Sequence, residues 1–208
     1  MAEWTSVTNR PQEPGVMLDD IISNVEVYGL AECIKASKYP MSVDTGKCTR
    51  EITDTTRRLS ECAPGTGHDQ FLTGIIAQFD LTLTVKAWTE AQRYHFLDFV
   101  SSQSTMHCIT KFDLDGRYIE YVDPMIIEIM KRKVAAYNAD PTPENYLKVL
   151  YSNPCGFRLT ARMTTNYRQL KTIYRQRRMH RLPEWRVVCK WIETLPHAEL
   201  IIGGVRDE

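Results

Sequence analysis

The stretch AQFDLTLTVK, residues 77–86, carries the clearest structural pattern in the chain. Its apolar residues Phe79, Leu81, Leu83 and Val85 alternate with polar ones. Successive side chains of a β-strand point to opposite faces, so a period of two is typical of a half-buried strand. The stretch therefore predicts a strand with one face in the core.

The segments around this strand predict a mixture of few strands and several helices. Residues 157–163 alternate in the same way, and residues 25–30 predict a third, short strand. Helices are expected over residues 48–62, 88–99, 123–137 and 142–151, after Asn166, and from Pro183 onward. Such a mixture indicates the α+β class, with helices flanking a sheet.

Local signals support three of these helices. Thr142 is a predicted N-cap followed by proline at the first turn, and Asn166 is a predicted N-cap of the next helix. Along the last helix, four apolar residues recur at i, i+3, i+4 and i+7, which predicts one face packed on a core: Trp185, Val188, Cys189 and Ile192.

Bulk properties place the chain among globular proteins. Its 208 residues are 43% hydrophobic and 25% charged, which favours one domain over residues 16–208. Residues 1–15 hold two prolines and few large apolar residues, and predict a flexible arm. We expect a cytoplasmic protein, because neither a membrane span nor a signal-peptide pattern is visible. The six cysteines are scattered, which predicts reduced, mostly buried thiols.

The net charge is zero, but residues 166–190 contain eight cations and a single acid, Glu184. Because so many cations cannot all be paired locally, this segment predicts an anionic ligand, with phosphate the natural candidate. Two alternatives stay open. One is a solvated surface helix, and the other is a nucleic-acid-binding face, for which Tyr167 and Tyr174 are few aromatic residues.

Two polar clusters are further candidates for binding. His68 lies in the glycine-flanked stretch GTGHDQFLTG, residues 65–74, and His95 precedes the polar stretch SSQSTMH, residues 101–107. Hydroxyl, amide and imidazole groups can orient a base or a phosphate. A surface turn and an ordinary polar loop are the alternatives. No Gly-x-Ser-x-Gly elbow favours a hydrolase, and no close histidine spacing favours a metal site.

Taken in chain order, four segments resemble the flavin-dependent thymidylate synthase (ThyX) family. GHDQFLTG is similar to its Gly-His-x-Ser-x-Leu-Glu-His element, and YHFLDFVSSQSTMH to its Arg-His-Arg-x-x-Ser-x-Asn-Glu-x-Ser-x-Arg-Tyr signature. YGLAECIKASKYP, residues 28–40, resembles its early strand, and NYRQLKTIYRQRRMHRLPEWR, residues 166–186, its Asn-x-Arg-x-Leu helix and following turn. The resemblance implies an α+β ThyX-like fold with an antiparallel or mixed sheet.

The resemblance also implies a function. It suggests a homotetramer whose active sites form between subunits and bind FAD, dUMP, NADPH and methylenetetrahydrofolate. Cofactor-binding positions carried over are His68, His95, Asn166, Arg168 and His180. Substrate-binding positions are Gln103, Ser104 and an arginine that holds the nucleotide, for which Arg177 is the best match and Arg175 and Arg178 are further candidates. No catalytic residue is assigned, and no metal is expected.

The chain departs from the signature at several positions. Tyr94 and Phe96 stand where the family has arginines, and Gly74 replaces the second histidine of the upstream element. Our first hypothesis is a divergent enzyme that methylates or hydroxymethylates C5 of a dUMP-type pyrimidine nucleotide. The alternative is a catalytically inactive protein that binds or sequesters a nucleotide on the same scaffold. A nucleic-acid-binding protein that uses the basic helix is a third hypothesis.

Overall fold

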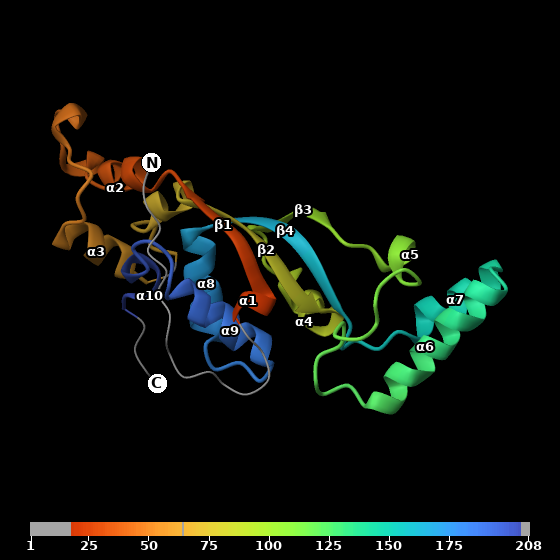
Figure 1. Ribbon diagram of the computed structural model, residues 1–208. Coiled ribbons are helices and arrows are strands. Elements are labelled where there is room, and N and C mark those ends of the chain that lie inside the picture. The colour runs from red at the N-terminus through yellow and green to blue at the C-terminus, as the bar shows by residue number, and fades with distance from the viewer. Residues whose placement is uncertain (1–17, 64, 205–208) are drawn as a thin grey trace.

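The computed structural model describes residues 18–63 and 65–204 (Figure 1). The arm predicted over residues 1–15 lies outside this range. Four strands form one antiparallel sheet in the order β1-β2-β4-β3. Their bounds are β1 Ile22–Tyr28, β2 Ile76–Thr84, β3 Leu97–Ser102 and β4 Arg158–Asn166.

Ten α-helices and three 3₁₀ helices accompany the sheet in this described part of the chain. The α-helices are α1 Leu18–Ile21, α2 Leu30–Ala36, α3 Asp54–Glu61, α4 Val85–Ala91, α5 Thr105–Cys108, α6 Pro124–Ala139, α7 Pro143–Ser152, α8 Tyr167–Arg177, α9 Pro183–Ile192 and α10 Glu199–Ile202. The 3₁₀ helices are η1 Tyr39–Met41, η2 Thr45–Lys47 and η3 Gln70–Gly74. The α+β class is confirmed.

The core lies between one face of the sheet and the C-terminal helices. Alternate residues of β2 and β4, including Phe79 and Met163, are buried there against Leu170 of α8 and Trp185 of α9. The rings of Phe79 and Trp191 lie 4.4 Å apart between centroids. Figure 1 shows α8, α9 and α10 on this side of the sheet. The alternation of β2 and the stripe of α9 therefore carry the fold, as the sequence predicts.

A smaller apolar cluster lies at one end of the molecule. There α6 packs against α7, and Met130, Val149 and Phe157 are fully buried. Figure 1 shows this helical pair at the opposite end of the molecule from α2 and α3. The predicted N-cap is confirmed, because Thr142 Oγ1 accepts a hydrogen bond from the Asn145 amide at the start of α7.

Two predicted helices need correction. The helix expected over residues 48–62 is confined to α3, because Thr53 caps it by accepting a hydrogen bond from the Thr56 amide. The helix expected over residues 88–99 is α4 in its first part only, and from Leu97 the chain is strand β3. Pairing of β3 with β4 satisfies its backbone groups and overrides the local pattern.

Smaller boundary errors affect two strands. The short strand predicted over residues 25–30 is β1, which begins earlier and ends at Tyr28, because Leu30 opens α2. The strand predicted over residues 77–86 ends at Thr84, whose Oγ1 accepts a hydrogen bond from the Ala87 amide and so caps α4.

The thiols are less buried than expected. All six cysteines lie in the described range and are free, but only Cys189 is buried and Cys155 is exposed. The prediction of mostly buried thiols is therefore wrong, although burial does raise the pKa of Cys189 to about 12. Across the described residues, the helices are too short or too polar to cross a lipid bilayer.

Candidate functional site

The candidate site lies where β4 ends and α8 begins. Asn166 is the last residue of β4, and its side-chain oxygen accepts a hydrogen bond of 2.9 Å from the Gln169 amide. The predicted cap is therefore confirmed. The backbone amide of Tyr167, the first residue of α8, donates a hydrogen bond of 3.0 Å to the Ile75 carbonyl oxygen. These bonds fix the first turn of α8 to the end of the sheet. The positive end of the α8 dipole therefore lies at the point where β4 ends.

A cleft of about 610 Å³ opens along one side of α8. Its walls come from three places: the first two turns of α8, the segment through η3, and the turn before β3. The lining residues are Gly65, Asp69, Gln70, Thr73, Phe96, Asn166, Arg168, Gln169, Lys171, Thr172, Arg175 and Gln176. The cleft is large enough for a small ligand such as a nucleotide.

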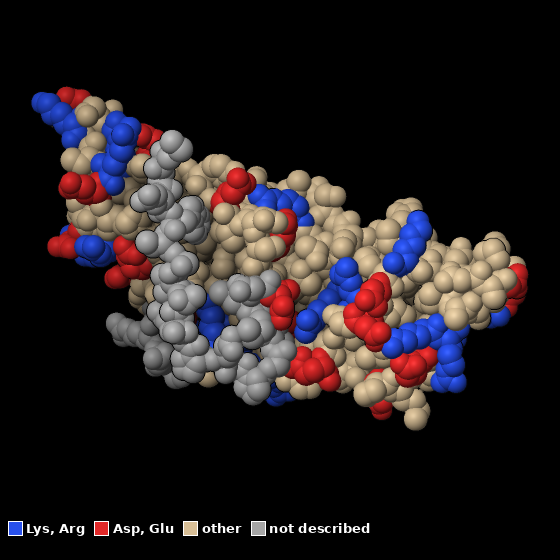
Figure 2. Space-filling view, in the orientation of Figure 1, with Lys and Arg blue, Asp and Glu red and all other residues tan. Residues whose placement is uncertain are grey.

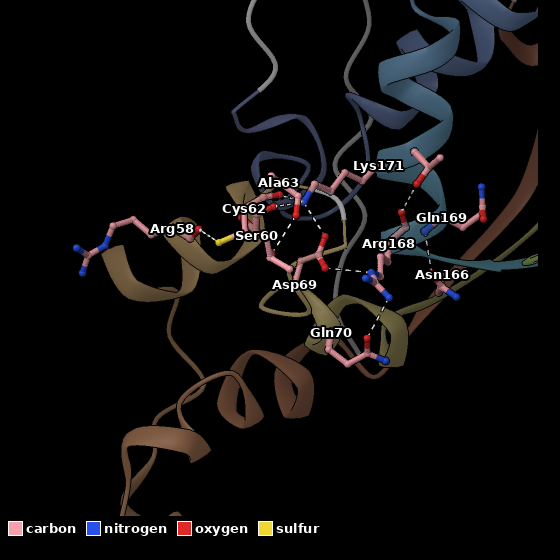
Figure 3. Close-up of polar contacts among 12 residues, drawn as sticks. Arg58, Ser60, Cys62, Ala63, Asp69, Gln70, Asn166, Arg168, Gln169 and Lys171 are labelled. Atoms are coloured by element: carbon pink, nitrogen blue, oxygen red, sulfur yellow. Dashed lines mark hydrogen bonds and ion pairs between the residues drawn. The ribbon is translucent and has the colours of Figure 1, made fainter.

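A buried carboxylate organises the base of the cleft (Figure 3). The side chain of Asp69 is 3% exposed and accepts from Arg168 Nε at 3.0 Å and from Lys171 Nζ at 2.8 Å. The Lys171 ammonium, which is equally buried, also donates to the carbonyl oxygens of Ser60 and Cys62. This network joins α3, the turn before η3 and α8. Two cations meet one acid, so the base of the cleft keeps a positive balance.

The arginines of the cleft differ in their engagement. Arg168 is held by Asp69 and also donates from Nη1 to Gln70 Oε1 at 3.0 Å. Arg175 lies two turns further along α8 and has no hydrogen bond or ion pair to any residue that the structure describes. A guanidinium beside a concave surface that is not engaged by the described residues is suited to receive a phosphate or carboxylate.

Phe96 gives the cleft an apolar wall. Its side chain is 61% exposed even though it is aromatic, and it lines the cleft opposite α8. An exposed aromatic ring beside polar groups offers a surface on which a flat heterocycle can stack. The aromatic replacement noted in the sequence therefore places a stacking surface at the cleft in place of a charge.

A second polar cluster lies at the C-terminal end of α8, and its side chains bind the guanidinium of Arg177. The Arg177 guanidinium donates to Glu90 Oε2 and to the Tyr94 hydroxyl, both at 2.7 Å. It also lies 4.9 Å from the Trp185 ring centroid and 2.7 Å from His180 Nε2. Burial, followed by the charge of Arg177, lowers the pKa of His180, so this imidazole is neutral beside the arginine.

Tyr94 is part of the same cluster. Burial raises the pKa of its hydroxyl above the usual value of 10.0. The hydroxyl therefore stays protonated, and it donates to Gln176 Oε1 at 3.0 Å while accepting from Arg177. The tyrosine that replaces a signature arginine thus binds an arginine of α8 internally.

Gln103 and Ser104 lie elsewhere. Gln103 follows β3. Its side-chain Oε1 accepts a hydrogen bond from the backbone amide of Thr160 at 3.0 Å, and its backbone amide donates to the Thr160 carbonyl oxygen. Thr160 precedes Asn166 by six residues of β4, which corresponds to about 20 Å of extended chain. Within one subunit, the cleft and the Gln103–Ser104 pair therefore occupy different ends of the sheet.

Comparison of whole structures identifies the architecture. The chain superposes on ThyX from Helicobacter pylori, determined with FAD and dUMP, with a TM-score of 0.70 at 15% identity over 89% of this chain and all of that one. The fold is that of ThyX. A second ThyX structure from the same organism, complexed with FAD and dUMP, gives a TM-score of 0.68 at 13% identity, with 89% of this chain and 99% of that chain covered. No family model matches the sequence, and no curated protein matches it either.

The ThyX fold brings only part of the predicted site together. Asn166, Arg168 and Arg175 meet at the cleft, whereas Arg177 and His180 lie in the second cluster. Arg178 also has a partner within the chain. His68 and His95 are exposed and do not line the cleft, although each directly precedes a residue that does. These assignments remain predictions.

Sequence reasoning missed two kinds of residue. It did not find Asp69 and Glu90, the acids that pair with the basic helix, because they lie 102 residues from Lys171 and 87 from Arg177 along the chain. The cations Lys171 and Arg177 are thus paired with acids that lie far away in sequence and close in space. It also missed Gln169. Among the described residues, no group of three or more histidine, cysteine, aspartate or glutamate side chains could hold a metal ion.

Proposed function

We propose that the protein binds FAD in the cleft along α8 and acts as a divergent ThyX-like enzyme on C5 of a dUMP-type pyrimidine nucleotide. The observation that carries the proposal is the cleft itself. It unites Asn166 and Arg168, both cofactor positions by resemblance, with the guanidinium of Arg175, which makes no hydrogen bond or ion pair to the described residues. The ThyX fold supports the same conclusion, since the superposed structures hold FAD and dUMP.

The residues present fit a flavin nucleotide. Phe96 offers an aromatic surface for a flat ring, and Arg168 and Arg175 offer charge for a diphosphate near the start of a helix. Gln169 contributes a buried amide that has no partner among the described residues. These side chains would hold and orient the cofactor, and Phe96 would keep water from one face of its ring. When bound, FAD supplies hydride transfer.

The separation of Gln103 from the cleft supports an assembly of subunits. If Gln103 and Ser104 contact the nucleotide, one chain cannot provide the whole site. Gln103 is bonded to Thr160, which lies about 20 Å along β4 from Asn166. A second copy could bring its own pair beside the cleft, as the resemblance to a homotetramer implies. NADPH and methylenetetrahydrofolate come with the same resemblance, and no residue is assigned to them.

The enzymatic proposal is tested by turnover. Purified protein is incubated with FAD, NADPH, methylenetetrahydrofolate and dUMP, and the mass of the nucleotide is measured by mass spectrometry. The proposal expects a gain of one methyl or hydroxymethyl group. Unchanged dUMP in the presence of bound FAD would contradict the transferase while leaving flavin binding in place. Mass measurement of the native assembly tests the tetramer, and a monomer under all conditions would contradict it.

A second candidate is a nucleotide-binding protein without the transferase activity. The observation that favours it is the state of Arg177, which Glu90, Tyr94 and Trp185 hold inside the chain. An arginine held in this way has few N–H groups left to donate to a nucleotide phosphate. Calorimetry with dUMP and related nucleotides, combined with the turnover assay, separates the two candidates, because this one requires binding without turnover.

The charge distribution gives little support to nucleic acid as the ligand. On the part of the face that Figure 2 shows uncovered, Lys and Arg side chains are scattered, and several stand beside Asp or Glu side chains. A nucleic-acid-binding face more often shows a continuous basic stripe. Binding of this kind would weaken steeply with salt, so a measured affinity for DNA or RNA that is steep in salt would favour it.

A further inference from the structure

Gln169 is a cleft residue whose side-chain amide is buried and lacks a hydrogen-bond partner among the described residues. Its side chain is 8% exposed, and its amide nitrogen Nε2 is fully buried with no hydrogen-bond partner among the described residues. In Figure 3 its end points away from the Asp69–Lys171 network and meets none of the other side chains drawn. Buried amides in folded proteins are nearly always paired, so one that lines a cleft requires an explanation.

The other carboxylate and amide side-chain oxygens of the cleft each already accept a hydrogen bond. Both oxygens of Asp69 accept from Arg168 and Lys171, and Gln70 Oε1 accepts from Arg168. Asn166 Oδ1 accepts from the backbone amide of Gln169 itself. The remaining side-chain amide of the cleft, Gln176, accepts from the Tyr94 hydroxyl. The partner of Gln169 Nε2 must therefore come from outside these side chains.

We propose that Gln169 is a specificity-determining residue whose amide donates a hydrogen bond to a ring carbonyl of the ligand. The ring would stack on Phe96, and a phosphate would reach Arg175. Six residues of α8 separate the two polar contacts, which corresponds to about 9 Å along the helix axis. The ligand class is thus a phosphorylated planar heterocycle with a ring carbonyl, which includes both flavin and uracil nucleotides.

This inference deepens the proposed function and rests on it, because it assumes that the cleft binds a nucleotide. It adds a prediction about which ligands the cleft excludes. A site built to donate to a carbonyl disfavours an analogue that presents an amino group there, since the buried donor is then left unpaired. Inosine monophosphate and AMP form a suitable pair for this purpose. They differ at C6, a carbonyl in the first and an amino group in the second, and at the adjacent N1, which carries a hydrogen only in the first.

The test compares Gln169→Met with wild-type protein. Methionine keeps the length and volume of the side chain and removes the amide. Binding of FAD, dUMP, inosine monophosphate and AMP is measured by calorimetry, and the melting temperature of the ligand-free protein is measured alongside. Gln92→Met, an exposed glutamine outside the cleft, is the matched control and is expected to change neither quantity.

The proposal expects wild-type protein to prefer inosine monophosphate over AMP by about tenfold, as one hydrogen bond allows. Gln169→Met should lose this preference, bind FAD or dUMP about tenfold more weakly, and melt at a higher temperature because an unpaired buried amide is gone. Gln169→Glu, which can no longer donate when ionised, should weaken the same carbonyl ligands at least as much. FAD and dUMP, measured separately, distinguish flavin from pyrimidine as the source of the carbonyl.

Three results would overturn the proposal. The first is wild-type protein that binds FAD or dUMP with an affinity that Gln169→Met leaves unchanged, and in that case nucleotide binding stands without the role of Gln169. The second is a variant that binds every ligand, AMP included, equally less well and melts at a lower temperature, as a purely structural role predicts. The third is wild-type protein that binds none of the four ligands, which removes the proposed function as well.

Discussion

The buried Asp69–Lys171 pair should be indispensable to the stability of the region around the cleft. Lys171→Met removes an ammonium that donates to Ser60 O at 2.5 Å, Cys62 O at 3.1 Å and Asp69 Oδ2 at 2.8 Å. Removing one partner of a buried ion pair costs about 3–5 kcal/mol. Arg168 still pairs with Asp69, so we expect the lower end, about 3 kcal/mol.

Urea unfolding followed by circular dichroism measures this loss directly. For a chain of this size, about 3 kcal/mol corresponds to a fall of about 6–12 °C in melting temperature. The variant Asp69→Asn/Lys171→Met should lose less than the sum of the two single changes, because the residues are in contact. Lys111→Met, at an exposed lysine, is the control and should stay within about 0.5 kcal/mol of wild type. A loss below about 1 kcal/mol for Lys171→Met would refute the reasoning.

Three further predictions concern the cleft, a turn and the second cluster. Arg175→Gln should weaken binding of phosphate-bearing ligands about tenfold or more and reduce the salt dependence of binding in calorimetry, so an unchanged affinity contradicts the assignment. Gly29→Ala should cost about 1–3 kcal/mol in urea unfolding, because φ is +76° and the new Cβ would lie 2.5 Å from Gly74 O; an unshifted midpoint speaks against this packing. Because burial and Arg177 lower the pKa of His180 from 6.5, the unfolded chain binds the proton more readily. The contribution of neutral His180 to stability is therefore complete above about pH 6.5 and declines as pH falls. In the variant His180→Gln, the free energy of unfolding should fall less steeply as the pH is lowered.

The sequence predicted the parts of the fold that depend on near neighbours. The alternation in β2, the Asn166 cap and the apolar stripe of α9 are each decided within a few residues, and each is confirmed. The start of strand β3, Leu97–Phe99, was assigned to a helix, because its order depends on pairing with β4, more than fifty residues later in the chain. Local propensity cannot report such a partner.

The candidate site shows the same division. Asn166 and Arg168 were found through a short motif, and they do lie together at a cleft. Asp69 and Glu90, which decide how the cations of α8 are used, are distant in sequence and carry no local signal. Gln169 occupies a position that the Asn-x-Arg-x-Leu motif leaves open, and its unpaired amide exists only once the chain is folded.

The absorption spectrum of the purified protein during titration with FAD tests the central claim most directly. The account predicts protein that is yellow as isolated, or that takes up FAD saturably with one site per chain and shifts the flavin absorbance in the visible blue. Arg175→Gln should require a higher FAD concentration to reach the same change. Colourless protein whose spectrum in the presence of FAD is only the sum of the two separate spectra would contradict flavin binding at the α8 cleft.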